Sequence, residues 1–194
     1  YHKYPTAKDN FLLMLHNHKK LDLWTPIENF AGTNQTTGKM YNDYLAERSA
    51  EIQAGAKHYT ALECYNNENG ASRIINLSDS VTLEILYNYY YDHKASTEND
   101  YSVCLMINHG SRKYLFTGDL EHKGEEYLVE YNTLGKVDLF KAGHHGSYTA
   151  STNALLDVIK PDIVCICCCA GSDEYTKNPL NMFPAQEFIS RICK

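Results

Sequence analysis

The sequence predicts a layered α/β domain, because β-type segments dominate its middle and then alternate with helix-type segments towards the C-terminus. Its 194 residues are the length of one substantial domain, and 43% hydrophobic with 22% charged residues is an ordinary globular composition. No internal repeat or low-complexity tract interrupts this pattern. We therefore expect residues 1–194 to form a single domain.

The first third of the chain has two stretches in which apolar residues recur at helical spacing. A short alternating segment that ends at Pro26 follows the first stretch, and a turn rich in Gly, Thr and Asn precedes the second. The predicted elements are a helix from Thr6 to about His18, a strand over Leu21–Trp24, a helix from Met40 to about Ala56 and a loop over residues 66–72.

From residue 72 the pattern changes to β, and further along β alternates with α. A His-Gly-Ser turn between two strands predicts a hairpin, Pro161 ends one helix, and Pro184 lies in the first turn of the last helix. The expected strands are Ser72–Leu77, Val81–Tyr90, Tyr101–Asn108, Lys113–Thr117, Val137–Ala142 and Ile163–Cys169, and the expected helices are Glu121 to about Asn132, Thr152–Ile159 and Pro184–Ile192.

The charge and hydropathy of the chain restrict its partners. A formal net charge of -6 argues against sequence-independent binding of nucleic acid, because such binding depends on clustered Lys and Arg side chains. A confined site that holds a cation would still accommodate a phosphate. No apolar run of about 18 residues predicts a membrane helix, and the N-terminus lacks a signal-peptide pattern. Since the chain opens on Tyr1, we expect a fragment or a processed product.

The chain has an odd number of cysteines, seven, and four of them lie within residues 165–169 of a predicted strand. Alternation puts Cys165, Cys167 and Cys169 on one face, where we expect them to be buried apolar residues. The alternative is a thiolate metal cluster, but one extended strand cannot easily wrap three sulfurs around a tetrahedral ion. Free cysteines indicate a reducing compartment, which we expect to be the cytoplasm.

Tyrosine is abundant, with 16 in the chain, and Tyr87, Tyr89 and Tyr91 fall on one face of a predicted strand. Packing between sheet and helix is the commoner use of such a face, and it is the interpretation we favour. An aromatic platform for bases or sugars is the alternative.

Two predicted strand ends have side chains that bind metals in other proteins. Asp119 follows the strand Tyr114–Phe116, and about 25 residues later His144 and His145 follow another strand. Asp119 alone would be read as a helix cap, and the His pair alone as an exposed loop. Together they favour one site, in which one imidazole is a ligand and the other is a second ligand or an outer-shell donor.

These segments resemble the C-terminal half of metallo-β-lactamase superfamily hydrolases, in the branch typified by the hydrolase domain of DNA-uptake competence (ComEC-type) proteins. The likeness is best from residue 99 to residue 192, about half of the chain. The segments that match are Asn99–Val103, Tyr114–Glu121, Gly124-Glu125 and Val137–Ser147.

The resemblance implies an αββα sandwich, which here lacks its N-terminal part, with one or two divalent metal ions between the sheets. Zinc is the usual metal and manganese the alternative. It implies that Asp119 bridges two metals and that His144 is a ligand, with His145 as a close competitor, so Asp119 and His144 would be the catalytic residues. Ser147 and Asn99 are expected to brace the loops of the site.

The chain departs from the family first in its N-terminal part, which has no His-x-His-x-Asp-His segment. In the nearest string, the acid Asp22 comes four residues after His18 instead of two, and on a helix His16 and His18 would point about 200° apart. Phe11–Pro26 resembles the helix and strand that follow the missing motif. We therefore expect the chain to start just downstream of it, and a degenerate, metal-free relative is the alternative.

The second departure lies before the last helix. Competence-type proteins often have a His-Pro pair there, where this chain has Phe183-Pro184. Asp173, Tyr175 and Asn178 are the polar groups left in the preceding loop, as weak candidates for substrate contacts.

The function that the sequence favours is a metal-dependent hydrolase in which a metal-activated water attacks a phosphodiester or another ester or amide bond. The chain as given is expected to be inactive, because it has only part of the ligand set. The alternative is a non-catalytic or truncated domain that acts as a binding or interaction module. A small-molecule or nucleotide-type substrate fits the acidic charge, and a nucleic acid would follow from family analogy alone.

Overall fold

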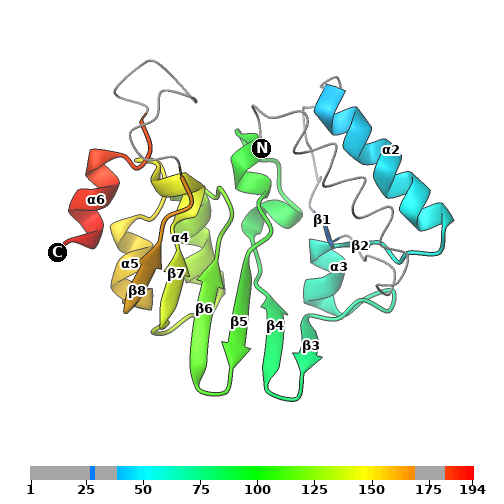
Figure 1. Cartoon of the computed structure of the whole chain (residues 1–194), viewed down its shortest axis with the longest axis horizontal. Coiled ribbons are helices and arrows are strands. Elements are labelled where there is room, and N and C mark those ends of the chain that lie inside the picture. The colour runs from blue at the N-terminus through cyan, green and yellow to red at the C-terminus, as the bar shows by residue number, and fades with distance from the viewer. Residues whose placement is uncertain (1–26, 29–38, 169–181) are drawn as a thin grey trace.

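The structure of the chain is a computed structural model that describes residues 27–28, 39–168 and 182–194. Its centre is a six-stranded sheet in the order β3-β4-β5-β6-β7-β8, and β1 pairs with β2 in a short parallel sheet (Figure 1). The strands are β1 Ile27–Glu28, β2 Tyr59–Thr60, β3 Ile74–Ser78, β4 Val81–Ile85, β5 Leu105–His109, β6 Arg112–Phe116, β7 Leu139–Lys141 and β8 Ile163–Cys165. The helices are α2 Lys39–Gln53, α3 Ala61–Asn66, α4 His122–Tyr131, α5 Asn153–Ile159 and α6 Gln186–Ile192, and the 3-10 turns are η1 Tyr89–Tyr91, η2 Glu98–Tyr101 and η3 Gly143–Gly146. The predicted mixed α/β architecture is confirmed.

The sheet changes from antiparallel to parallel at β6. Strands β3 to β6 pair antiparallel in sequence order, and the predicted hairpin is the β5–β6 pair. Strands β6, β7 and β8 pair parallel, with α4 and α5 as the connections between them. Since parallel strands end at the same edge of a sheet, the segments that follow β6, β7 and β8 lie close together.

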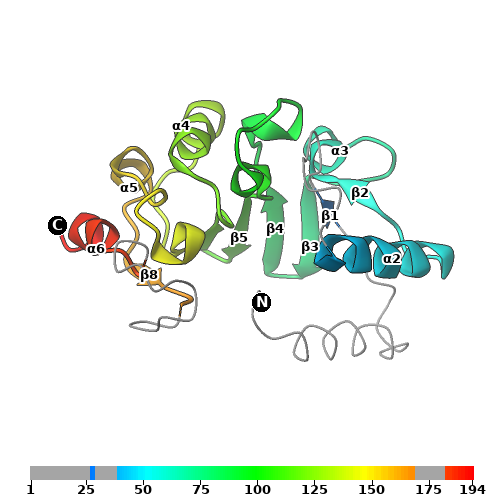
Figure 2. The same cartoon turned by 90° about the horizontal axis from the view of Figure 1, so that it is seen from above.

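The main core lies between the parallel half of the sheet and the helices α4 and α5, which lie on one side of the sheet in Figure 2. Leu115 of β6 and Phe140 of β7 are fully buried there against Leu128, Leu155 and Ile159 of the helices. Alternation along each strand turns Tyr114, Leu139 and Ile163 to the opposite face. One face of the sheet thus has a helical layer that fixes the strand ends.

The predicted strand Val81–Tyr90 is too long. β4 ends at Ile85, and the tyrosines after it form η1, so they do not alternate across a sheet. The buried Asn88 side chain accepts a hydrogen bond from the Tyr90 N–H and donates to carbonyls of the η2 segment, which turns the chain out of the strand. Packing as the role of Tyr87, Tyr89 and Tyr91 is confirmed, because Tyr91 is buried and the half-buried Tyr87 and Tyr89 pack against core clusters.

The predicted buried cysteine strand is wrong for Cys165 and Cys167, both of which are exposed. β8 ends at Cys165 and is the last strand of the six-stranded sheet, so no further strand of that sheet shields these side chains. The predicted helix Thr6–His18, the strand Leu21–Trp24 and Cys169 lie outside the described residues. Within the described part, no helix has the length and apolar character needed to cross a membrane.

Candidate metal centre

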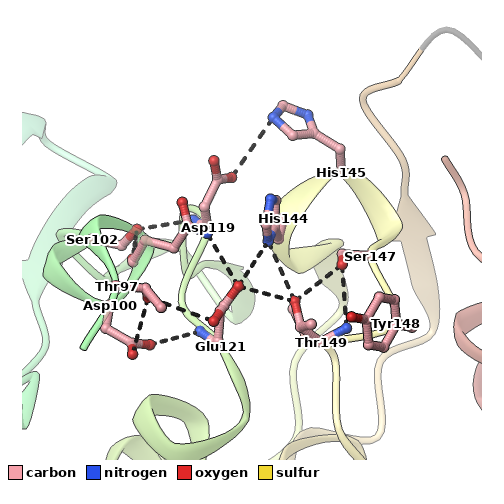
Figure 3. Close-up of polar contacts among 12 residues, drawn as sticks. Thr97, Asp100, Ser102, Asp119, Glu121, His144, His145, Ser147, Tyr148 and Thr149 are labelled. Atoms are coloured by element: carbon pink, nitrogen blue, oxygen red, sulfur yellow. Dashed lines mark hydrogen bonds and ion pairs between the residues drawn. The ribbon is translucent and has the colours of Figure 1, made fainter. Parts of the chain in front are cut away.

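The turns after β6 and β7 meet at the carboxyl edge of the sheet. Phe116 and Lys141 are partners in the parallel ladder, so the residues just after them start side by side. The N–H of His144 donates to the carbonyl of Gly118 at 3.0 Å and joins the two turns directly. This contact brings Asp119 and the two histidines into the one neighbourhood that Figure 3 shows.

Asp119 is held through its backbone. Its N–H donates to the Ser102 hydroxyl at 2.9 Å, and that hydroxyl donates to the Asn99 carbonyl. The preceding Gly118 has a positive φ of 59°, and a Cβ there would lie 2.7 Å from the Ser102 hydroxyl oxygen. The helix cap is Glu121, so the interpretation of Asp119 as the cap of α4 is wrong, and its carboxylate is available to a ligand.

The two histidines lie in a turn that uses an uncommon backbone conformation. His144 has φ 43° and His145 has φ 57°, both in the left-handed region that residues with a Cβ rarely occupy. Each such residue costs of order 1 kcal/mol, and strain of this kind gathers at functional sites. The conformation directs two neighbouring imidazoles into the same region.

His145 has the orientation of a metal-ligating histidine. Its Nδ1 lies 2.7 Å from the Cys167 carbonyl oxygen, which can only accept a hydrogen bond, so the ring hydrogen is assigned to Nδ1. Its Nε2 then has the lone pair, and it lies 3.7 Å from Asp119 Oδ1. Two ligands of one tetrahedral zinc at about 2.1 Å are roughly 3.4 Å apart, so the spacing of this pair is close to that of a shared ion.

His144 is oriented by a different acceptor. Its Nδ1 lies 3.5 Å from Glu121 Oε1 and 3.4 Å from the Thr149 hydroxyl oxygen. The same Glu121 oxygen accepts from Asn99 Nδ2 at 3.1 Å and from Thr149 at 3.2 Å. Figure 3 shows the other nitrogen of the His144 ring on the side that faces Asp119 and His145. A carboxylate behind an imidazole is the usual outer shell of a metal-binding histidine.

The buried carboxyl group of Asp100 holds the backbone of Glu121 in place. Asp100 is only 4% exposed, accepts the N–H of Glu121 at 3.1 Å and accepts from the Thr97 hydroxyl. Burial and the neighbouring Glu121 charge raise the pKa of Asp100, although the Glu121 N–H opposes this shift. The start of α4 is thereby fixed under the site.

Phe183 forms an apolar wall beside the histidines. Its ring centroid lies 5.8 Å from that of His144 and 6.1 Å from that of His145. It stands where the sequence comparison expected a histidine in competence-type proteins. A phenylalanine ring has no atom that can bind a metal ion, so this position adds an apolar contact to the two histidines.

The donor set of the described residues is partial. Asp119 and the two histidines have the chemistry that zinc or manganese needs, and the His145 tautomer fits. Within residues 27–28, 39–168 and 182–194, however, no three His, Cys, Asp or Glu side chains are grouped closely enough to hold an ion. A metal centre at this edge would need at least one more ligand or a small movement of His144.

The structure brings together the three predicted site residues, with Asp119 nearest to His145 and His144 turned towards Glu121. Ser147 contacts Thr149 and Asn99 contacts Glu121, which agrees with the bracing roles expected of them. His16, His18, Asp173, Tyr175 and Asn178 lie outside the described residues. Sequence reasoning missed Glu121 and Thr149, although Glu121 falls inside the segment that carried the family resemblance.

Comparison with known proteins supports the same part of the chain. Residues 95–170 match the model of the family described as the metallo-beta-lactamase superfamily. Competence protein ComA of Neisseria gonorrhoeae is 30% identical over 132 residues, which are 68% of this chain and 17% of that protein. Recombination protein 2 of Haemophilus influenzae is 38% identical over 69 residues, and ComE operon protein 3 of Bacillus subtilis is 30% identical over 66.

These last two matches cover 36% and 34% of this chain, and 8% of each of the two relatives. The chain thus spans a small part of the length of the curated relatives that it matches. The resemblance to the competence-type branch of the superfamily is confirmed at this level.

Proposed function

Residues 95–170 are a metallo-β-lactamase superfamily segment, and on that premise we propose that this chain supplies part of the site of a metal-dependent hydrolase. Asp119, His145 and His144 would hold one or two divalent ions, zinc first and manganese second. Such an ion would lower the pKa of a bound water towards neutrality and so supply the nucleophile.

The observation that carries this proposal is the orientation of the Asp119–His145 pair. His145 donates from Nδ1 to a backbone carbonyl and presents Nε2 to a carboxylate 3.7 Å away. An exposed histidine pair on a loop would have no reason to adopt two consecutive left-handed residues. Both ring orientations and the strained turn are explained if the imidazoles face an ion.

The residues of the chain have separate tasks in this proposal. Asp119 and His145 would bind and orient the metal ion, while Glu121 and Thr149 fix the ring of His144. Phe183 limits the access of water on one side of the histidines, which strengthens electrostatic interactions there. The remaining ligands would come from polypeptide outside the described residues.

We propose a phosphodiester as the substrate class, in a small or nucleotide-type molecule. One of the relatives is named for competence and one for recombination, which makes a nucleic acid the substrate to test by analogy. The net charge of -6 favours a small substrate over a long polyanion.

A second candidate function is a non-catalytic module that binds another protein segment. The observation in its favour is that no group of three metal-type donors exists among the described residues. The strained histidine turn would then be a remnant of an ancestral site.

Metal analysis of the purified protein separates the two functions. We expect about one or two zinc or manganese ions per chain, lost on Asp119→Ala. The matched control is Asp157→Ala, since Asp157 is an exposed acid of α5 far along the chain from Asp119. A protein that binds neither metal at any pH, or binds it equally well without Asp119, would favour the module.

A further inference from the structure

Glu125 of α4 is a fully buried carboxyl group that touches none of the proposed ligands. It is 0% exposed, and its two oxygens accept the backbone N–H groups of Ser151 and Thr152 at 2.7 Å each. A buried carboxyl is costly unless its oxygens are satisfied, so its presence needs a structural reason. That reason lies in the segment 147–152, which follows the histidine turn.

The segment 147–152 is held from two sides. Glu125 binds its N–H groups, and Arg191 of α6 binds its carbonyls, donating to Tyr148, Ala150 and Ser151. These carbonyl contacts measure 2.7 to 3.1 Å and come from a helix some 40 residues further along the chain. A loop whose N–H groups and carbonyls are both bound by side chains of two helices has little freedom to move.

The held segment reaches the histidine turn at two points. The Ser151 hydroxyl accepts the N–H of Gly143 at 3.1 Å, and the Thr149 hydroxyl lies 3.4 Å from His144 Nδ1. A Cβ on Gly143 would lie 3.3 Å from Glu125 Oε1 and 3.1 Å from the Ala150 Cβ. Gly143 therefore packs directly on the carboxyl group, and a side chain there would make contacts tighter than usual for a Cβ.

We propose that Glu125 is a positioning residue, which fixes the segment 147–152 and through Ser151 and Thr149 sets the place of the His144–His145 turn. This proposal rests on the proposed function only because it takes His144 to be a metal ligand. The geometry itself, a carboxyl under Gly143 with two short backbone contacts, does not depend on a metal.

Backbone amide exchange of Glu125→Gln tests the positioning role without any metal. Gln keeps the size of Glu but replaces one acceptor oxygen with an amide NH2 donor, so one of the two backbone N–H groups loses its acceptor. We expect amide exchange at Ser151, Thr152 and Gly143 to become about tenfold faster or more. The matched control, Glu130→Gln on the exposed face of α4, should leave these rates unchanged.

Two results would overturn the proposal. Exchange at Gly143 that stays at the wild-type rate would show that Glu125 caps α5 without reaching the turn. Equal acceleration at the core amides Met106 and Leu115 would show a general loss of stability instead of a positioning role. If Glu125→Gln does not fold, Ser151→Ala removes the hydroxyl that accepts from Gly143, and it should speed exchange at Gly143 but not at Thr152.

Ring resonances of His144 and zinc titration complete the test. Glu125→Gln should shift the His144 ring signals and weaken zinc binding about tenfold or more, whereas Glu130→Gln should change neither. A wild-type protein that binds no zinc would refute the proposed function alone, because the exchange rates would still decide the role of Glu125.

Discussion

At the level of single residues, the two histidines of the η3 turn are fixed by different acceptors. His145 has a short contact to a backbone carbonyl, and His144 has longer contacts to Glu121 and Thr149. A ring held by a short contact keeps its orientation when the ion is absent. His145 is therefore the better-organised candidate ligand of the two.

Alanine substitutions should rank the two histidines. We expect His145→Ala to abolish zinc binding, as Asp119→Ala does, because it removes one member of the closest pair. His144→Ala should leave weaker but measurable binding, reduced about 10–100-fold, because the His144 ring is turned towards Glu121 and is held by longer contacts than His145. Calorimetric titration with zinc measures both, and the reverse ranking would make His144 the primary ligand.

Glu125 should also make stability depend on pH. Burial raises the pKa of its carboxyl group from 4.5 to about 7, although the N–H groups of Thr152 and Ser151 and the charge of Arg191 oppose the shift. Cys104 is its other titratable neighbour, and the thiol stays neutral in this range because burial and the Glu125 charge raise its pKa. Between pH 4.5 and about pH 7, Glu125 keeps its proton in the folded protein but has lost it in the unfolded chain. The stability of the folded protein therefore falls as pH rises through this range.

The difference between wild type and Glu125→Gln isolates this effect. The free energy of unfolding of the wild type should fall by up to about 3 kcal/mol more than that of the variant from pH 4.5 to pH 7, and the difference should be constant above pH 8. Urea unfolding at a series of pH values measures it, with Glu130→Gln as the control that keeps the wild-type slope. Identical slopes in all three proteins would contradict the prediction.

The candidate ligands could be found from the sequence because each follows a predicted strand directly. Asp119, His144 and His145 need only the local order strand, glycine, polar residue. The roles of Glu121 and Glu125 could not be found that way, since each depends on contacts with residues more than 20 positions away. Charged residues in an amphipathic helix pattern are ordinarily read as its exposed face.

Among the elements, the turns at the carboxyl edge are set by glycine. Gly118 lies in the turn after β6 with a positive φ and packs against Ser102, whose hydroxyl accepts a hydrogen bond from the Asp119 N–H. Gly110 in the β5–β6 turn has nearly the same φ, 58° against 59°, but a Cβ added there would meet no atom within 4 Å. A comparison of substitutions at these two glycines therefore separates the cost of backbone strain from the cost of a close contact.

Alanine at these two glycines should have unequal effects. Gly110→Ala should cost about 1 kcal/mol, because the left-handed conformation disfavours a Cβ. Gly118→Ala should cost more, and it should weaken zinc binding because Ser102 must move away from the Asp119 N–H. Urea unfolding and zinc titration measure the pair, and equal effects on both readouts would show that Ser102 does not position Asp119.

Element prediction succeeded where the local pattern was unambiguous. The β5–β6 hairpin and the strand–helix alternation after it follow from turn residues and apolar spacing. The helix α3 was missed although Thr60 and Glu63 form a capping box, a signal that the sequence does contain. The tyrosine segment after Ile85 was mistaken for strand, because the contacts of Asn88 that turn the chain come from residues 12 to 14 positions away.

At the scale of the whole molecule, the described sheet has a helical layer on one face and an apolar face on the other. The second face has a hollow of about 590 Å³ lined by Arg112, Tyr114, Phe116, Asp138, Leu139 and Ile163. Ile163 is 56% exposed there, whereas Leu115 on the helical face is 0% exposed. The sandwich implied by the family resemblance would place its second sheet on this face.

A matched pair of substitutions tests this one-sided arrangement. Leu115→Ala and Ile163→Ala remove similar apolar volume, but only the first opens a cavity in a packed core. We expect Leu115→Ala to lower the free energy of unfolding by about 2–5 kcal/mol. Ile163→Ala should lower it by less than about 1 kcal/mol, since a half-exposed side chain loses little burial.

Urea unfolding over a range of protein concentrations makes the comparison decisive. If Ile163→Ala costs as much as Leu115→Ala, the apolar face is covered in solution. A cost that depends on protein concentration would identify a second copy of the chain as the cover, because association stabilises the folded state by mass action. A cost that does not would place another segment of the same chain there, and the layer expected of the sandwich would then be supplied from within the polypeptide.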